Sequence, residues 1–151
     1  NYILLFNGEI YNYKELNKEI QKVDKNFKSD SDTKTLINYF LNFGFEKSLK
    51  NLRGMWSLCL LDTKKQTLYL SRDRLGIKPL FYYKDKNKFI FSSSIRSINY
   101  LLKKKKINQE YLKKYLIKGS LDYSKNTPYI QSNFKCVKAE HIILCSHFLI
   151  N

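Results

Sequence analysis

The sequence predicts an α+β fold in which two layers of antiparallel sheet are covered on the outside by helices. Two observations carry this prediction. Short apolar runs with strand character come in pairs joined by turn residues, as in hairpins. Between these pairs lie segments whose apolar residues recur at helical spacing. The 151 residues are 43% hydrophobic, which is enough for one domain with a substantial core.

The first element is a strand over residues 2–6, where five bulky apolar residues follow one another. Asn7-Gly8 then predicts a tight turn, because this dipeptide is typical of turns. A helix is expected next, since four apolar residues recur at helical spacing: Tyr13, Leu16, Ile20 and Val23. This order would bring the Asn7 amide and the Gly8 N–H to the open end of a sheet, where two donors can stabilise an oxyanion. A turn without any chemical role is the alternative.

A short strand is predicted around Phe27, followed by a helix whose apolar positions begin at Leu36. Three residues qualify as the N-cap of that helix: Asp30, Ser31 and Asp32. Gly44 is expected to end it. A short amphipathic segment over residues 45–52 leads to the next strand.

Residues 55–62 form an almost continuous apolar run, which indicates a strand buried on both faces. Residues 67–73 alternate in polarity and are predicted to pair with it as a hairpin. After a charged loop over residues 72–80, a second hairpin is expected from residues 81–84 and 88–93.

Helical spacing resumes at Ile95 and continues to Leu102. A further helix is predicted to begin after Asn108 as its cap and to end at Gly119. The C-terminal part offers two weak strands, over residues 134–137 and 141–145.

The net charge of +15 raises the question of nucleic-acid binding. Only four of the 28 basic residues are arginine, and the lysines are scattered along the chain with a single run at residues 103–106. Nucleic-acid grooves usually use arginine together with exposed aromatic side chains. The sequence therefore argues against a specific nucleic-acid site, and such a site is not expected.

No apolar run approaches the roughly 18 residues that a membrane span requires, so no membrane partner is expected. The three cysteines, Cys59, Cys136 and Cys145, have no metal-ligand spacing, and no metal site is predicted. An odd number of cysteines, with one inside an apolar strand, fits a reducing cytoplasm best.

Four strings of residues, in this order and at these intervals, resemble the class II glutamine amidotransferase domain, and within that family the asparagine synthases. They are FNGEIYNYKEL (6–16), SDT (31–33), LRGMWSLCLLD (52–62) and LYLSRDRLGIKPLFYY (68–83). The resemblance is clear over residues 2–98 and weak over residues 103–151. Residues 1–151 are therefore expected to form part of such a domain, without the synthetase domain that follows it in the family.

The resemblance implies a four-layer αββα fold, that of the N-terminal-nucleophile hydrolases. It implies hydrolysis of L-glutamine to glutamate and ammonia by the thiol of an N-terminal cysteine. In the family, ammonia passes to a synthetase domain, where it attacks an aspartyl-adenylate made with ATP and magnesium. No cofactor is expected in the glutaminase domain itself, and a homodimer is one arrangement left open.

The resemblance also assigns site residues. Asn7 and Gly8 match the oxyanion hole of the family, while Glu9 and Asp32 match acids that lie near the α-amino group of bound glutamine. A negative charge there selects an amino acid over a simple amide. From the residues alone, a helix cap is the favoured role of Asp32, and Asp30 competes with it for the acidic role.

The string RDRLGIKPL is interpreted as structural, with Arg72, Asp73 and Arg74 pairing among themselves to hold the loop. Departures from the family pattern include Lys34, Ser94 and residues 137–141. The ATP-binding SGGxDS string of the synthetase domain does not occur in the sequence.

The N-terminal cysteine of the family is not in this chain, since its first residue is asparagine. The three internal cysteines lack a free α-amino group, so the chain as it stands is expected not to hydrolyse glutamine. Two alternatives stay open. One is a related amidotransferase with another ammonia acceptor, as in polysaccharide biosynthesis. The other is a non-catalytic basic binding module on the same scaffold.

Overall fold

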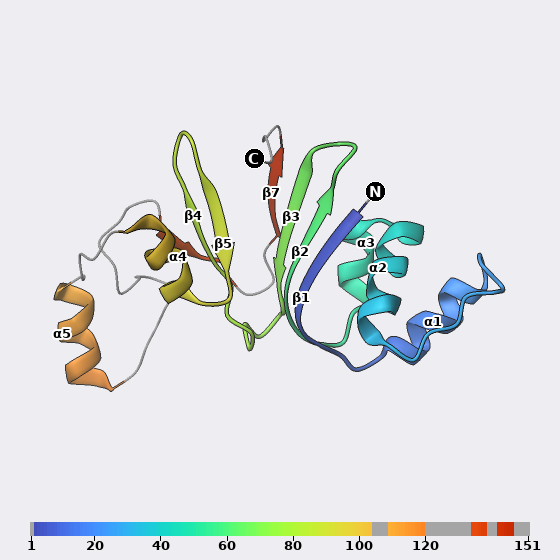
Figure 1. The fold of residues 1–151 in the computed structure, drawn as a ribbon. Helices are drawn as coiled ribbons and strands as arrows, with labels where there is room; N and C mark the ends of the chain where they lie inside the picture. Colours follow the sequence, from blue (N-terminus) through green and yellow to red (C-terminus); the bar gives the residue numbers. More distant parts are fainter. Residues whose placement is uncertain (1, 104–108, 120–133, 139–141, 147–151) are drawn as a thin grey trace.

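Two antiparallel sheets lie between two layers of helices in the computed structural model (Figure 1). The structure describes residues 2–103, 109–119, 134–138 and 142–146. The larger sheet has the strand order β1-β2-β3-β7 and the smaller one the order β5-β4-β6. The predicted arrangement, sheet on sheet with helices outside, is confirmed.

Four strands form the larger sheet: β1 (Tyr2–Ile10), β2 (Gly54–Asp62), β3 (Thr67–Arg72) and β7 (Ile142–Ser146). All neighbouring pairs are antiparallel. The predicted hairpin of the two central strands is confirmed, and β2 is buried along most of its length as expected.

Three helices lie on the outer side of this sheet: α1 (Tyr13–Gln21), α2 (Asp32–Phe43) and α3 (Phe45–Asn51) (Figure 1). Helix α2 packs against β1, and α1 and α3 pack against α2. Their buried side chains form one core with the sheet face that carries Trp56, Leu58 and Leu60. Gly44 separates α2 from α3 with a φ of +81°, a conformation that favours glycine.

The smaller sheet consists of β4 (Phe81–Lys84), β5 (Phe89–Ser92) and β6 (Phe134–Cys136). Helix α4 (Ile95–Leu102) packs on its outer face, where Ile98 contacts the cluster of Phe81 and Tyr83. Helix α5 (Gln109–Lys118) lies beyond α4, and Gly119 ends it as predicted (Figure 1). The proposed cap Asn108 lies outside the described residues.

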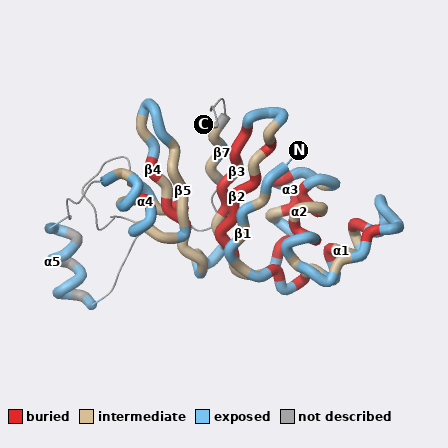
Figure 2. Tube along the Cα trace, viewed as in Figure 1, coloured by how far each residue is buried: buried red, intermediate tan, exposed pale blue. Residues whose placement is uncertain are grey.

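Figure 2 shows that buried residues concentrate on β2, β3 and the inner sides of the helices. A second core lies between the two sheets, where Cys59, Leu70 and Leu80 meet Val137. The two helix layers and the two sheets thus enclose three hydrophobic cores, one between each sheet and its helices and one between the sheets.

The tight turn predicted at Asn7-Gly8 is wrong, because β1 continues through both residues to Ile10. Each of the two is paired with β2, Asn7 with Ser57 and Gly8 with Trp56. The chain reverses at Tyr11 and Asn12 instead.

The Asn12 side chain holds this reversal in place. It donates to Asn51 O at 2.9 Å and accepts from Arg53 N at 2.9 Å, so the start of α1 is joined to the segment that leads into β2.

The strand predicted around Phe27 is also wrong. Phe27 is buried, but its N–H donates to Asp24 O in a turn and its carbonyl accepts from the Gln21 side chain. These local bonds take the place of a strand partner. Helix α1 ends at Gln21, and the predicted core residue Val23 is 62% exposed.

The charged loop after β3 is held by its acid and its arginines, but the predicted pairing among them is wrong. Asp73 is fully buried and accepts from the backbone N–H groups of Leu75, Ile77 and Lys78. Arg72 donates to carbonyl groups within the loop and to Val137 O at 3.0 Å.

Arg74 reaches Lys50 O at 2.7 Å. Backbone groups, rather than opposite charges within the string, satisfy the three side chains.

Candidate active site

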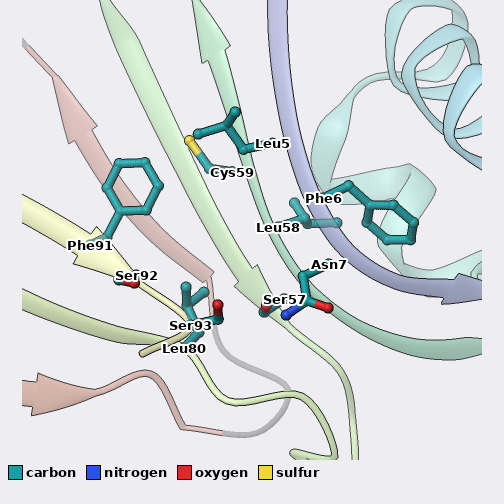
Figure 3. Close-up of a pocket in the computed structure, with 10 residues that line it drawn as sticks. All are labelled: Leu5, Phe6, Asn7, Ser57, Leu58, Cys59, Leu80, Phe91, Ser92 and Ser93. Atoms are coloured by element: carbon teal, nitrogen blue, oxygen red, sulfur yellow. The ribbon is translucent and has the colours of Figure 1, made fainter. Parts of the chain in front are cut away.

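A cavity of about 210 Å³ opens between the two sheets at the β1 side of the molecule (Figure 3). Its walls come from β1 and β2 of the larger sheet and from the end of β5 in the smaller one. The lining residues are Leu5, Phe6, Asn7, Ser57, Leu58, Cys59, Leu80, Phe91, Ser92 and Ser93. Most of this surface is apolar, and the polar groups are one amide and three hydroxyls.

Asn7 enters this cavity because of the alternation of side chains along β1. Leu4 and Phe6 pack toward the helix-covered core, whereas Leu5 and Asn7 are exposed on the inner face. Ser57 is the partner of Asn7 on β2, and Figure 3 shows the Asn7 amide directed toward it. A hydrogen-bond donor therefore stands at the mouth of a mostly apolar cavity.

Gly8 lies where β1 and β2 approach each other closely. A Cβ atom on Gly8 would lie 2.1 Å from Met55 O, and one on Gly54 would lie 2.1 Å from Glu9 O. Gly54 also has a φ of +152°, which side chains rarely adopt. Packing alone therefore explains glycine at both positions, whatever else the Gly8 N–H does.

Asp32 stands in the first turn of α2, next to the end of β1. Its Oδ2 accepts from the backbone N–H of Ile10 at 3.1 Å. Ser31, not Asp32, is the N-cap of the helix, since its Oγ accepts from Lys34 N at 3.3 Å. Of the three candidate caps, Ser31 is thus the correct one, and the Asp32 carboxylate is partly exposed.

The four predicted site residues lie at the same end of β1, but Asn7 is the one among them that lines the cavity. Asn7, Gly8 and Glu9 are consecutive on β1, and Asp32 is bonded to the residue that follows them. Glu9 follows Asn7 by two residues on β1, so its side chain lies on the same inner face of the sheet, and it is exposed. Asp30 is exposed as well, and the contact with the end of β1 is made by Asp32.

Cys59 lines the same cavity but is a poor nucleophile. Its side chain is only 3% exposed, and burial raises the pKa of its thiol to about 12. A thiol of this kind stays protonated at neutral pH, and the thiolate is the reactive form.

Sequence reasoning missed the three serines of the cavity, Ser57, Ser92 and Ser93. Ser57 had a visible signal, because it is the only polar residue in the apolar run 55–60. The other two lie at the end of β5 and directly after it, and no local pattern reveals which cavity they face.

Within residues 2–103, 109–119, 134–138 and 142–146, no three His, Cys, Asp or Glu side chains are gathered as metal ligands would be. No helix in these ranges has both the length and the apolar character needed to cross a membrane.

Comparison with protein families gives one match over nearly the whole chain. The family model described as a glutamine amidotransferase domain matches residues 1–147. It therefore includes the C-terminal part, where the resemblance in the sequence is weak.

Curated relatives are much longer than this chain. A protein of Methanocaldococcus jannaschii named asparagine synthetase [glutamine-hydrolyzing] 2 is 36% identical over 146 residues, which are 93% of this chain and 27% of that protein. Asparagine synthetase [glutamine-hydrolyzing] 3 of Bacillus subtilis is 36% identical over 97 residues, 64% of this chain and 16% of that protein. The chain thus spans about a quarter or less of these relatives.

Solved structures share the fold. The glutamine phosphoribosylpyrophosphate amidotransferase from B. subtilis, in complex with ADP and GMP, superposes with a TM-score of 0.56. The match has 19% sequence identity and covers 65% of this chain and 23% of that one. The architecture of two sheets between helices is therefore that of the N-terminal-nucleophile hydrolase amidotransferases.

Proposed function

The chain belongs to the glutamine amidotransferase family, and on this premise we propose that it is the glutamine-hydrolysing part of an asparagine synthase-like enzyme. The names of the relatives support the choice of asparagine synthase over other amidotransferases. Since the chain spans only part of those relatives, the reaction that consumes ammonia belongs to the remainder of such an enzyme.

One observation carries the proposal: the Asn7 amide faces a mostly apolar cavity, with Gly8 and Glu9 beside it and Asp32 bonded to Ile10. Attack of a thiolate on the glutamine side-chain amide places a negative charge on the amide oxygen. The Asn7 amide and the Gly8 N–H are the donors proposed for that oxyanion. Few polar groups compete with them in the cavity, so their effect on the charge is strengthened.

Glu9 and Asp32 are proposed to hold the α-ammonium group of glutamine. Both acids lie at the same end of β1, within a chain whose net charge is +15. Two carboxylates in this setting favour a ligand with a positive group next to the amide, as glutamine has.

The reaction needs a cysteine other than the three in this chain. Cys59 is held protonated by burial, and none of the three carries a free α-amino group. We propose that, as in the family, the thiol of an N-terminal cysteine supplies the nucleophile, and that residues 1–151 alone do not hydrolyse glutamine.

The partners follow from the same premise. We propose L-glutamine as the substrate and a synthetase domain as the partner that receives ammonia, with ATP and magnesium used there rather than in this domain. Activated aspartate is the proposed acceptor because the relatives are named as asparagine synthetases. A homodimer and a cytoplasmic location complete the proposal.

The test is an Asn7→Ala substitution in a chain extended upstream to carry the N-terminal cysteine. Glutamate release is expected to fall about a hundredfold to a thousandfold in kcat, as for loss of one oxyanion donor. Asn42→Ala, an exposed asparagine on α2, serves as the matched control and should keep full activity. Undiminished glutamate release by the Asn7 variant would refute the oxyanion role. Gly8 is unsuitable for this test because any side chain there collides with β2.

A further inference from the structure

A second cavity, of about 350 Å³, lies between the sheets at the edge formed by β6 and β7. Each of these strands is the last of its own sheet. The cavity shares no lining residue with the one that contains Asn7. It is therefore a separate site, and the glutaminase chemistry makes no use of it.

Apolar and aromatic side chains form one part of its walls. Tyr82 and Phe89 come from the smaller sheet, with ring centroids 5.8 Å apart, and Ile143 and Cys145 come from β7. Burial raises the pKa of the Tyr82 hydroxyl, as expected where water is partly excluded. The volume lies at the lower end of the range of about 300–1,000 Å³ that is typical of ligand pockets.

Two lysines interrupt this apolar surface. Lys135 is the cross-strand partner of Tyr82, and Lys84 is the cross-strand partner of Phe89. Each lysine side chain therefore lies on the same face of the sheet as the aromatic side chain that it pairs with. Both lysines are exposed at the rim. Among the described residues that line the cavity, none is acidic.

Protection of a sheet edge explains only one of these lysines. An inward-pointing charge on an edge strand prevents pairing with another chain, and Lys135 lies on the edge strand β6. Lys84 lies on β4, the central strand of its sheet, where no edge needs protection. Two ammonium groups beside aromatic and aliphatic side chains favour a ligand that carries a negative charge as well as an apolar part.

We propose that this cavity binds a small amphipathic organic anion, with its apolar body against Tyr82 and Phe89 and its anionic group between Lys84 and Lys135. A medium-chain carboxylate has this chemistry. The two lysines supply charge and the walls supply apolar contact, so neither a neutral molecule of the same length nor inorganic phosphate meets both requirements.

The test uses octanoate as the probe and isothermal titration calorimetry on the full chain. Octanoate is expected to bind, and 1-octanol and inorganic phosphate are expected to bind at least about tenfold more weakly. The double variant Lys84→Gln/Lys135→Gln should weaken octanoate binding roughly tenfold, because each ion pair at an exposed rim is worth a few-fold in affinity.

Lys86→Gln/Lys138→Gln is the matched control, since it removes the same charge from exposed lysines that do not line the cavity. It should change the affinity by less than about twofold. Equal weakening in both double variants would show attraction to overall charge and would overturn the proposal. Absence of octanoate binding, or equal binding of octanol, would overturn it as well.

Cys145 gives an independent readout because it lies in the cavity wall, whereas Cys136 packs on the opposite face of the smaller sheet. Octanoate should slow alkylation of Cys145 several-fold and leave Cys136 unchanged, as measured by mass spectrometry of the labelled peptides. Equal rates with and without octanoate at Cys145 would contradict binding in this cavity.

Discussion

The Asp32 carboxylate accepts a hydrogen bond from the backbone N–H of Ile10 at 3.1 Å, so the first turn of α2 is bonded directly to the end of β1. Twenty-two positions separate the two residues in the chain. The bond fixes the acid at the end of β1 that carries Glu9 and also ties a helix to a strand. A substitution at Asp32 therefore has to be designed so that these two roles can be told apart.

Asp32→Asn makes this separation, because an asparagine keeps an oxygen that can accept from Ile10 but loses the charge. In the extended, cysteine-bearing chain, the KM for glutamine is expected to rise at least about tenfold, as for loss of a hydrogen bond to a charged group. The value of kcat should change much less. Steady-state glutaminase kinetics measures both.

Ser31→Ala is the control for this experiment. It removes the cap of α2 and should cost about 1 kcal/mol of stability without changing the KM. If Asp32→Asn lowered only the free energy of unfolding, the acid would have a purely structural role.

Asp73 is expected to be among the most important residues for stability. It is fully buried, and its two oxygens accept from four backbone N–H groups, three in its own loop and one at Trp56. Asp73→Ala leaves these donors without a partner and should cost about 3–5 kcal/mol in urea unfolding.

The neighbouring Arg74→Ala removes an exposed side chain and should cost less than about 1 kcal/mol. A similar loss of unfolding free energy in the two variants would show that any substitution in this loop has the effect, and that the hydrogen bonds of Asp73 do not cause it.

Asp62 should make the fold sensitive to acid. The backbone N–H of Lys65, with further hydrogen bonds from the Tyr2 hydroxyl and Lys64 N, holds the pKa of Asp62 below its ordinary value. A carboxylate with a lowered pKa in the folded state stabilises that state above its unfolded pKa. This contribution is lost as the pH falls through the folded value, below about pH 4.

Urea unfolding of Asp62→Asn across this range provides the measurement. The variant should be less stable than the parent at neutral pH, and the difference should shrink as the pH falls toward about 2. Asp30→Asn, at an exposed position, is the control. A difference that is constant with pH would contradict the role of the Asp62 charge.

Cys59 should resist alkylation in the folded protein. With a thiol pKa of about 12, its thiolate fraction at pH 8 is roughly a thousandfold below that of an ordinary cysteine. Iodoacetamide labelling at pH 8 should therefore modify the half-buried Cys145 first, with Cys59 labelled only after denaturation. Labelling of Cys59 at a rate similar to Cys145 would show that the cavity opens readily.

Local patterns predicted the strands and helices well where the apolar residues of a segment recur with a clear strand or helix period. The hairpin of β2 and β3 and the one of β4 and β5 appear where expected. The reversal at Asn7-Gly8 was predicted wrongly because its decisive partner is distant: pairing with residues 56 and 57 keeps the chain extended through a dipeptide that prefers turns.

Phe27 illustrates the opposite error. Its burial is visible in the sequence, but burial alone does not specify a strand, and turn bonds to Asp24 satisfy its N–H. Asp73 lies between two arginines in the sequence and was therefore expected to pair with them. In the structure its carboxylate is fully buried and accepts hydrogen bonds from backbone N–H groups of the loop instead.

The candidate site could be predicted in part because its residues are local. Asn7, Gly8 and Glu9 follow one another, and only Asp32 comes from elsewhere. The serines that complete the cavity come from β2, from the end of β5 and from the residue after it, and their meeting depends on how the two sheets stack. No spacing along the chain encodes that stacking.

The alternation along β1 has a consequence for how this chain can change over generations. Replacing Ile3 or Leu5 with another side chain leaves Asn7 directed into its cavity. Loss or gain of a single residue between Tyr2 and Asn7 would instead move one part of β1 to the opposite face. Either Leu4 leaves the helix-covered core, or Asn7 turns toward the helices and Gly8 leaves its close contact with β2. Lineages that retain the chemistry should therefore show substitutions in this stretch but a constant length.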